Sequence, residues 1–261
     1  MPSADAFLGG RVVARQPAAG RHRAGLEAVL IAAAVPADFA GIAVDLGAGV
    51  GVAGLCIAAR APAARVILAE RDREAVRYAR VSLDLPDNAT FAGRVTIAEV
   101  DIAAGEPERV KAGLARASAD VVVMNPPFHD AGSVRAPKGV ARAAAHVLAD
   151  GGVEPWVRAA ASVLKPDGTL VAVFRADGLA TLIAALGARF GGLAVLPVYP
   201  RAGAEAHRIL IAGKKGSGAP LRILPGLTLH PPAGSTYLSE ASRLLRDGAG
   251  LAEVDAAWTL I

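Results

Sequence analysis

Three acidic residues stand at equivalent places in the chain, each at the end of an apolar run of strand length: Asp45, Glu70 and Asp101. The carboxyl ends of parallel strands converge on one crevice, so we expect these carboxylates to share a site. There Glu70 can accept hydrogen bonds from two ribose hydroxyls, and Asp101 can accept one from an adenine amino group. Taken singly, Asp101 is also a candidate turn cap, and Glu70 a candidate partner of Arg71 or Arg73.

A glycine-rich loop contains the first of these acids. Residues 45–51 read DLGAGVG, a D-x-G-x-G-x-G pattern that leads straight into a helical pattern. Glycines permit a tight turn and close ligand approach, and free N–H groups at a helix start can receive a carboxylate or phosphate. Gly49, Gly51 and Gly54 also satisfy G-x-G-x-x-G, which keeps a nicotinamide or flavin cofactor as an alternative. The three acids favour S-adenosylmethionine, and the predicted cofactor residues are Asp45, Gly47, Ala48, Gly49, Gly51, Glu70, Asp101 and Asn125.

A second motif follows the apolar run 119–124 and consists of Asn125, Pro126, Pro127 and Phe128. It is similar to the N-P-P-[YF] motif of methyltransferases that act on a nitrogen conjugated with a planar system. Such a nitrogen is a poor nucleophile because its lone pair is delocalised. The Asn125 side-chain oxygen and the Pro126 carbonyl can accept its two N–H groups and stabilise the charge that develops during attack. Phe128 offers a face on which a flipped base can stack.

A doubly wound sheet would bring these residues together. From residue 41 onward, apolar runs alternate with helical patterns, which is typical of such a sheet. Two later runs are joined by a short turn-rich connection at 200–203, so we expect them to pair antiparallel. The predicted strands are 42–46, 66–70, 95–100, 119–124, 169–174, 193–198 and 208–212, and the helices 23–34, 51–60, 72–84, 106–117, 152–164, 178–189 and 238–245.

This pattern predicts an α/β, Rossmann-like class I methyltransferase fold. Its mostly parallel sheet has seven strands, ends in an antiparallel hairpin and carries helices on both faces. We divide the chain into an N-terminal capping segment at 1–40, a methyltransferase domain at 41–215 and a C-terminal appendage at 216–261 packed on the same domain.

Composition narrows the class of protein. The 261 residues are 53% hydrophobic and 20% charged, which suits a globular chain that buries a sizeable core. A single cysteine, Cys56, excludes an intramolecular disulfide, and the five histidines lack the spacing of metal ligands, so we expect no metal. No signal peptide or uninterrupted apolar span is visible, and we expect a cytoplasmic protein outside the membrane.

The positive charge is concentrated in two segments. Residues 11–23 and residues 201–222 each carry a net +4, as much as the whole chain, so the rest is acidic overall. Two basic segments on an acidic body predict a surface for a polyanion such as RNA. A solvated protein face that binds no partner can carry the same pattern of charge. The candidate RNA contacts are Arg21, Arg23, Arg201, Arg208, Lys214 and Lys215.

Over nearly its whole length the chain resembles the bacterial tRNA(Val) adenine-N6 methyltransferase family. The resemblance rests on DAFLGG at 5–10, RAGLEA at 23–28, the glycine loop, the N-P-P-F motif, the hairpin at 200–208 and the tail segments 215–222 and 227–230. It implies S-adenosylmethionine as cofactor, tRNA as partner and the adenosine immediately 3′ of the anticodon as target. Related enzymes also suggest that Glu27 reaches the methionine end of the cofactor.

Alternatives remain for the target. Phe128 stands where the adenine-N6 enzymes often carry tyrosine, and N-P-P-F-H is similar to ribosomal RNA guanine-N2 methyltransferases. A protein-glutamine N5 methyltransferase is disfavoured, since only about forty residues precede the sheet and such enzymes carry a helical domain there. An NAD(P)-dependent oxidoreductase and a non-enzymatic RNA-binding protein with a vestigial cofactor pocket are the further alternatives.

Overall fold

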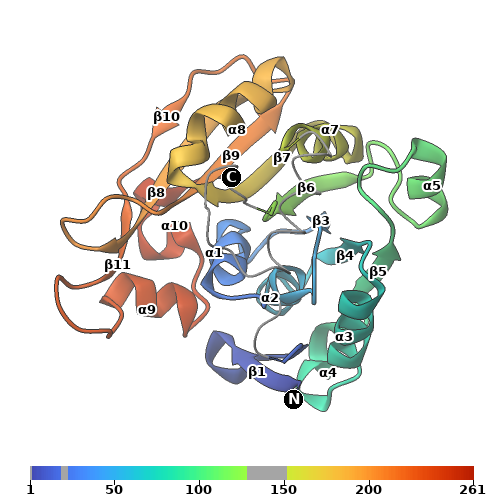
Figure 1. Cartoon of the computed structure of the whole chain (residues 1–261), viewed down its shortest axis with the longest axis horizontal. Coiled ribbons are helices and arrows are strands. Elements are labelled where there is room, and N and C mark those ends of the chain that lie inside the picture. The colour runs from blue at the N-terminus through green and yellow to red at the C-terminus, as the bar shows by residue number, and fades with distance from the viewer. Residues whose placement is uncertain (1, 19–22, 128–151) are drawn as a thin grey trace, which may run out of the picture.

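A nine-stranded sheet forms the centre of the protein in a computed structural model, which describes residues 2–18, 23–127 and 152–261 (Figure 1). Its strand order is β10-β8-β9-β7-β6-β3-β4-β5, with β11 paired to β8. The strands are β3 (Ile42–Leu46), β4 (Arg65–Glu70), β5 (Val95–Glu99), β6 (Ala119–Met124), β7 (Leu164–Arg175), β8 (Phe190–Arg201), β9 (Arg208–Lys215), β10 (Arg222–Ile223) and β11 (Leu227–His230).

The predicted Rossmann-like fold is confirmed. Strands β5, β4, β3, β6 and β7 are parallel, and β9 runs antiparallel to both β7 and β8. The predicted count of seven strands was too low because the tail adds β10 and β11, both parallel to β8. These strands have two and four residues, too short for a recognisable alternation.

Helices cover both faces of the sheet. One face carries α1 (Leu26–Ala34), α2 (Val52–Arg60) and α3 (Arg73–Leu83), and the other carries α7 (Glu154–Val163) and α8 (Leu179–Leu186). Asp72 begins α3 by accepting hydrogen bonds from the backbone N–H groups of Glu74 and Ala75. The helix expected at 106–117 ends early: α5 covers Glu106–Lys111, because Gly113 takes a positive φ of 92°.

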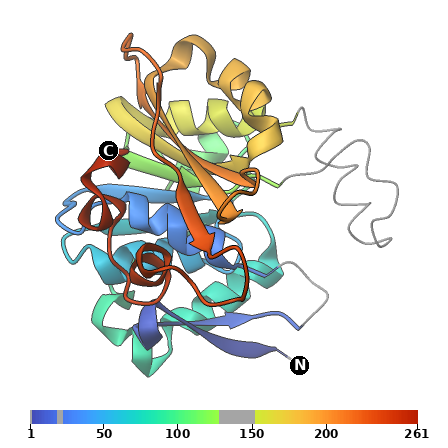
Figure 2. The same cartoon turned by 90° about the vertical axis from the view of Figure 1, so that its left-hand side faces the viewer.

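The sequence did not reveal an N-terminal β-hairpin of β1 (Ser3–Phe7) and β2 (Val12–Gln16). Side chains of Asn88 and Ser82 hydrogen-bond to the backbone of β2, as a neighbouring strand would do in a larger sheet. Asn88 accepts from the Val13 N–H at 3.0 Å and donates to the Val13 carbonyl at 2.7 Å, while the Ser82 hydroxyl accepts from the Arg15 N–H at 2.8 Å. The open end of the hairpin lies on the same side of the molecule as the carboxyl end of β6 (Figure 2).

The C-terminal segment covers α1 with α9 (Ser239–Leu245) and α10 (Leu251–Val254). Arg60, only 6% exposed at the end of α2, ties this segment to the core. Its Nε donates to the Gly248 carbonyl at 2.8 Å, and its Nη1 donates to the carbonyls of Ala32 and Val35 at 2.7 Å. One guanidinium therefore joins α2, the end of α1 and the tail.

Within residues 2–18, 23–127 and 152–261, no helix is long and apolar enough to cross a membrane.

Candidate active site

The predicted cofactor residues lie at one edge of the sheet. Leu46 of β3 is level with Ala69 of β4 and Met124 of β6, so Glu70 and Asn125 emerge beside the glycine loop. Glu70 is level with Glu99 of β5, and Asp101 follows two residues later. The carboxyl ends of β5, β4, β3 and β6 thus present Asp101, Glu70, Asp45 and Asn125 in that order.

The glycine loop folds back onto the end of β4. The N–H groups of Gly47 and Ala48 donate to the Ala69 carbonyl at 2.8 and 3.0 Å. Gly47, Gly49 and Gly51 take φ values of 71°, 57° and 90°, where a side chain strains the backbone. A Cβ added at Gly49 would meet no described atom within 4 Å, so this side of the loop is open to a ligand.

Backbone N–H groups hold the Glu70 carboxylate in place. Oε2 accepts from Gly49 at 2.8 Å, and Oε1 accepts from Arg71 and Asp72 at 2.8 Å each. These three bonds use both acceptor positions of Oε1 and one of Oε2, which leaves one position on Oε2, since a carboxylate has about four acceptor positions. Glu70 is thus fixed before any hydroxyl binds to it.

Asp101 serves as a turn cap and as an ion-pair partner. Its Oδ1 accepts from the Ala103 N–H at 2.8 Å, and its Oδ2 accepts from Arg71 Nη1 at 2.9 Å. Partial burial alone raises the pKa of Asp101, but the hydrogen bond from Arg71, the Ala103 N–H and the charge of Arg71 together hold it below its usual value. The carboxylate is therefore ionised and remains an acceptor at neutral pH.

Asp45 is 4% exposed and faces the start of α2. Its Oδ2 accepts from the Gly54 N–H at 2.9 Å. Burial raises the pKa of Asp45 to about 7, against the opposing effect of the Gly54 N–H and with a further increase from the charge of Glu70. The buried carboxyl thus changes its charge near neutral pH, and a nearby cation would favour its ionised form.

Asn125 directly follows β6 and carries an unpaired acceptor. Its side-chain Oδ1 is buried and has no hydrogen-bond partner among the described residues. A buried polar atom without a partner costs roughly 1–3 kcal/mol, which is tolerated where a ligand supplies the missing donor. Pro126 is buried and Pro127 exposed, whereas Phe128 lies outside the described residues.

Basic residues occupy the same edge beyond Asn125. Arg175 ends β7 and is level with Arg208 at the start of β9, and Arg201 ends β8. Arg175 pairs with Asp177, and Arg208 Nε lies 3.3 Å from Glu27 Oε1 on the first turn of α1. Arg201 donates to the Pro231 carbonyl at 3.2 Å. The edge is therefore acidic from β5 to β3 and basic from β7 to β8, with Asn125 between the two halves.

The structure does not bring all of the predicted RNA contacts to the same edge of the sheet. Lys214 and Lys215 end β9, which runs antiparallel, so they lie at the opposite edge of the sheet from Arg208. There Lys214 pairs with Asp167 at 3.8 Å, and Lys215 donates to the Leu164 carbonyl at 2.6 Å.

Arg23 is partly buried and engaged with groups of the N-terminal segment. It pairs with Asp5 and donates to the Pro17 carbonyl at 2.7 Å and to Ser3 Oγ at 2.8 Å. Arg21 lies outside the described residues. Among the predicted cations in the described part of the chain, Arg201 and Arg208 lie at the site edge beside Asn125. Arg175 lies outside the two basic segments and was not predicted to contact RNA. Its position directly after the predicted strand 169–174 could have indicated that it lies at this edge.

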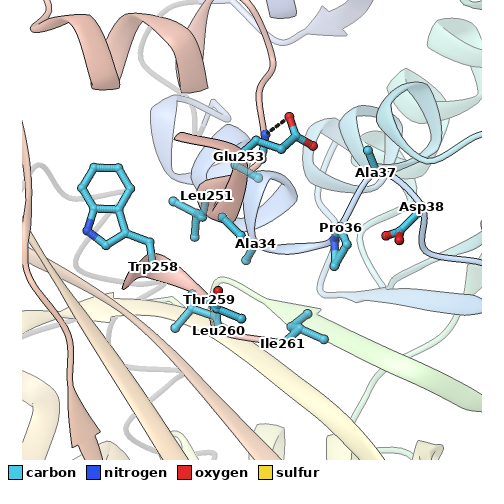
Figure 3. A pocket seen from close by; sticks show the side chains of 13 residues that line it. Ala34, Pro36, Ala37, Asp38, Leu251, Glu253, Trp258, Thr259, Leu260 and Ile261 are labelled. Atoms are coloured by element: carbon cyan, nitrogen blue, oxygen red, sulfur yellow. Dashed lines mark hydrogen bonds between the residues drawn. The ribbon is translucent and has the colours of Figure 1, made fainter. Parts of the chain in front are cut away.

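A separate hollow of about 380 Å³ lies at the opposite edge of the sheet, between the end of α1 and the tail (Figure 3). Ala34, Pro36, Leu251 and Ile261 line it, and the Gly250 N–H donates to the Glu253 carboxylate at 3.0 Å beside it. None of the predicted cofactor residues lines this hollow.

Comparisons with known proteins agree with this arrangement. Residues 24–157 match the family model of the methyltransferase small domain. The crystal structure of a predicted O-methyltransferase, protein Atu636 from Agrobacterium tumefaciens, is 35% identical with a TM-score of 0.73, covering 86% of this chain and 97% of that chain. No curated protein matches the chain.

Two more distant structures share the fold. The Thermus thermophilus 16S rRNA N2 G1207 methyltransferase RsmC, solved with AdoMet and guanosine, is 23% identical with a TM-score of 0.55 and covers 82% of this chain and 50% of that chain. Pyrococcus horikoshii TYW2, solved with MeSAdo, is 14% identical with a TM-score of 0.51, covering 83% and 72%.

Proposed function

The chain belongs to the methyltransferase small domain family and is an S-adenosylmethionine-dependent enzyme, and from this premise we propose that it methylates an exocyclic nitrogen of an RNA base. The observation that carries the proposal is the buried Oδ1 of Asn125, which has no hydrogen-bond partner in the described part of the chain and lies at the junction of the acidic and basic halves of the site edge. An amino group is the donor that this acceptor lacks.

The residues present fit the cofactor. The open side of Gly49 leaves room beside the loop, and the preorganised Glu70 carboxylate keeps one acceptor position, on Oε2, for a ribose hydroxyl. Asp101 would accept from the adenine amino group, and Asp45 would face the ammonium group of the methionine portion. The cofactor supplies an electrophilic methyl group on a sulfonium.

Asn125 and Pro126 would then act on the substrate nitrogen. The Asn125 Oδ1 and the Pro126 carbonyl would accept its two N–H groups, orient its lone pair and stabilise the positive charge that forms as the N–C bond is made and the methyl–sulfur bond of the sulfonium breaks. The methylated, positively charged nitrogen would then lose a proton to water, so no strong general base is required.

The basic half of the edge suits a phosphate backbone. Arg175, Arg201 and Arg208 lie beside Asn125, on the side away from the cofactor acids. The resemblance to tRNA(Val) adenine-N6 methyltransferases favours adenine N6 next to the anticodon of tRNA as the target. Guanine N2 of ribosomal RNA is the alternative target, since the structurally similar Thermus thermophilus protein is named as a 16S rRNA N2 G1207 methyltransferase.

Substrate class is tested by incubating the enzyme with methyl-labelled S-adenosylmethionine and separate pools of unmodified tRNA, ribosomal RNA and cell protein. We expect label in the tRNA pool. Label in the protein pool alone would contradict an RNA substrate and point to a glutamine amide.

Arg175→Gln and Arg208→Gln are expected to flatten the salt dependence of RNA binding. For single-stranded RNA, each lost phosphate contact reduces the slope of log Kd against log salt concentration by roughly 0.7. Binding is measured by fluorescence anisotropy across a salt series. Lys214→Gln at the opposite edge is the matched control and should leave the slope unchanged. If the slopes of all three variants are equal, Arg175 and Arg208 do not contact RNA phosphates.

Cofactor binding is expected to release a proton from Asp45 at pH 6. The pKa of about 7 means that Asp45 is mostly protonated there in the free enzyme, and the ligand ammonium favours the ionised form. Affinity should therefore rise with pH up to about 7 and then level off. Calorimetry in buffers of different ionisation enthalpy measures the released proton. Asp45→Asn should abolish the buffer dependence, and identical behaviour of the two proteins would contradict this role.

The same group predicts how the stability of the free enzyme depends on pH. An Asp in the unfolded chain titrates near 3.9, below the folded pKa of about 7, so the folded state holds the extra proton between these values. The contribution of Asp45 to the free energy of unfolding is therefore favourable at low pH and falls as pH rises from about 4 to 7.

A further inference from the structure

Trp156 lies against the first glycine of the cofactor loop. It is the third residue of α7, and a Cβ added at Gly47 would lie 2.2 Å from its Cη2 and 2.4 Å from its Cζ3. The indole thus occupies the space that a side chain at position 47 would need. Only glycine at this position lets the ring approach the loop so closely.

The ring also packs against the apolar cluster on the α7 face of the sheet. Trp156 is half-buried and packs against the cluster that contains Leu46, Val100 and Ile102. Ile102 directly follows Asp101. The end of β3, the residues that flank Asp101 and the indole thus all belong to the α7 face of the sheet.

An adenosine group suits this region better than a methionine group. Glu70 and Asp101 supply the polar contacts that a ribose and an adenine amino group require, while Trp156 and Ile102 supply apolar surface for a flat ring. The charged ammonium and carboxylate of a methionine portion would lose hydration against an indole without gaining a partner.

We propose that Trp156 is a wall of the cofactor pocket and that its indole contacts the adenosine end of S-adenosylmethionine. The proposal rests on the proposed placement of the cofactor over residues 47–51 and Glu70. It assigns a binding role to a residue whose sequence context indicates only core packing.

Fluorescence gives a direct test, since Trp156 and Trp258 are the only tryptophans in the chain. Trp258 is 5% exposed and packs in the other hydrophobic cluster, so Trp258→Phe leaves Trp156 as the single reporter. Titration of this variant with S-adenosylhomocysteine is expected to change the emission of Trp156 with the same Kd that calorimetry measures for the wild type. Binding without any change in emission would overturn the proposal.

Affinity gives a second test. Loss of an aromatic surface stacked on a base weakens binding by roughly 5- to 150-fold, so Trp156→Leu should show a loss in this range and Trp156→Phe much less. The Trp156→Leu substitution should weaken the binding of methylthioadenosine, which lacks the amino-acid end, by the same factor as the binding of S-adenosylhomocysteine. Unchanged affinity of Trp156→Leu, or a loss confined to S-adenosylhomocysteine, would contradict an adenosine contact.

These outcomes separate the two proposals. Binding by the wild type without a response from either Trp156 variant defeats only the assignment of Trp156. Absence of binding by the wild type defeats the placement of the cofactor and the Trp156 assignment with it. If Trp156→Leu fails to fold in a thermal melt, the Trp258→Phe titration still decides the question.

Discussion

Replacing Asn125 by alanine is expected to lower kcat about 10²- to 10³-fold and to change cofactor affinity only a few-fold. The variant loses the side-chain oxygen that stabilises the charge on the substrate nitrogen, and one preorganised group of this kind contributes about 2.7–4 kcal/mol to the transition state. Single-turnover kinetics with saturating cofactor measure the loss.

Thermal stability distinguishes this loss from a folding defect. The buried Oδ1 of Asn125 has no partner among the described residues, so its removal should leave the melting temperature unchanged or raise it. Asn125→Asp keeps an acceptor oxygen and should retain more activity than the alanine variant. A kcat for Asn125→Ala within threefold of wild type would contradict the proposed role.

Arg60→Ala is expected to lower the free energy of unfolding by about 3–5 kcal/mol. The guanidinium is almost fully buried, and its removal leaves the carbonyls of Ala32, Val35 and Gly248 without their donors. Arg60→Lys should recover little of this stability, because a lysine ammonium lacks the planar fork of donors with which the guanidinium reaches three carbonyls.

Chemical denaturation measures this difference, with Arg73→Ala as the control. The Arg73 side chain is 91% exposed, so its removal should change stability by less than about 0.5 kcal/mol. A loss below about 1 kcal/mol for Arg60→Ala would show that the tail is held mainly by the apolar contacts of α9 and α10. The direct effect of Arg60 on catalysis should be small, since it lies at the edge of the sheet opposite the site.

The central strands and the edge that carries the site were predictable because each follows a local rule. A continuous apolar run marks a buried parallel strand, and the residue after it marks the edge where strand ends converge. This rule brings Asp45, Glu70, Asp101 and Asn125 together without any knowledge of tertiary contacts.

The features that escaped prediction depend on distant partners or on strand direction. Arg23 faces Asp5, 18 residues earlier, and no local pattern indicates that pair. Lys214 and Lys215 were grouped with Arg208 because they are close in sequence, but an extended strand carries its two ends to opposite edges of the sheet. The hairpin of β1 and β2 depends on Asn88 and Ser82, which belong to elements far along the chain.

The position of Asn125 connects the chemistry with the choice of substrate. On one side lie carboxylates that backbone N–H groups hydrogen-bond, and on the other lie arginines paired with acidic side chains or backbone carbonyls. A cofactor with hydroxyl and amino groups suits the first side, and a phosphate-bearing substrate suits the second. The unpaired acceptor lies where the two would meet.

The identity of the methylated atom most directly tests the proposed methylation of an exocyclic nitrogen of an RNA base. Unmodified tRNA is incubated with the enzyme and methyl-labelled S-adenosylmethionine, and the digested nucleosides are identified by mass spectrometry, with Asn125→Ala run in parallel. We expect label on an exocyclic nitrogen, as N6-methyladenosine, and almost no label with the variant. Label on a ribose or other oxygen, or equal label with the variant, would contradict this proposal.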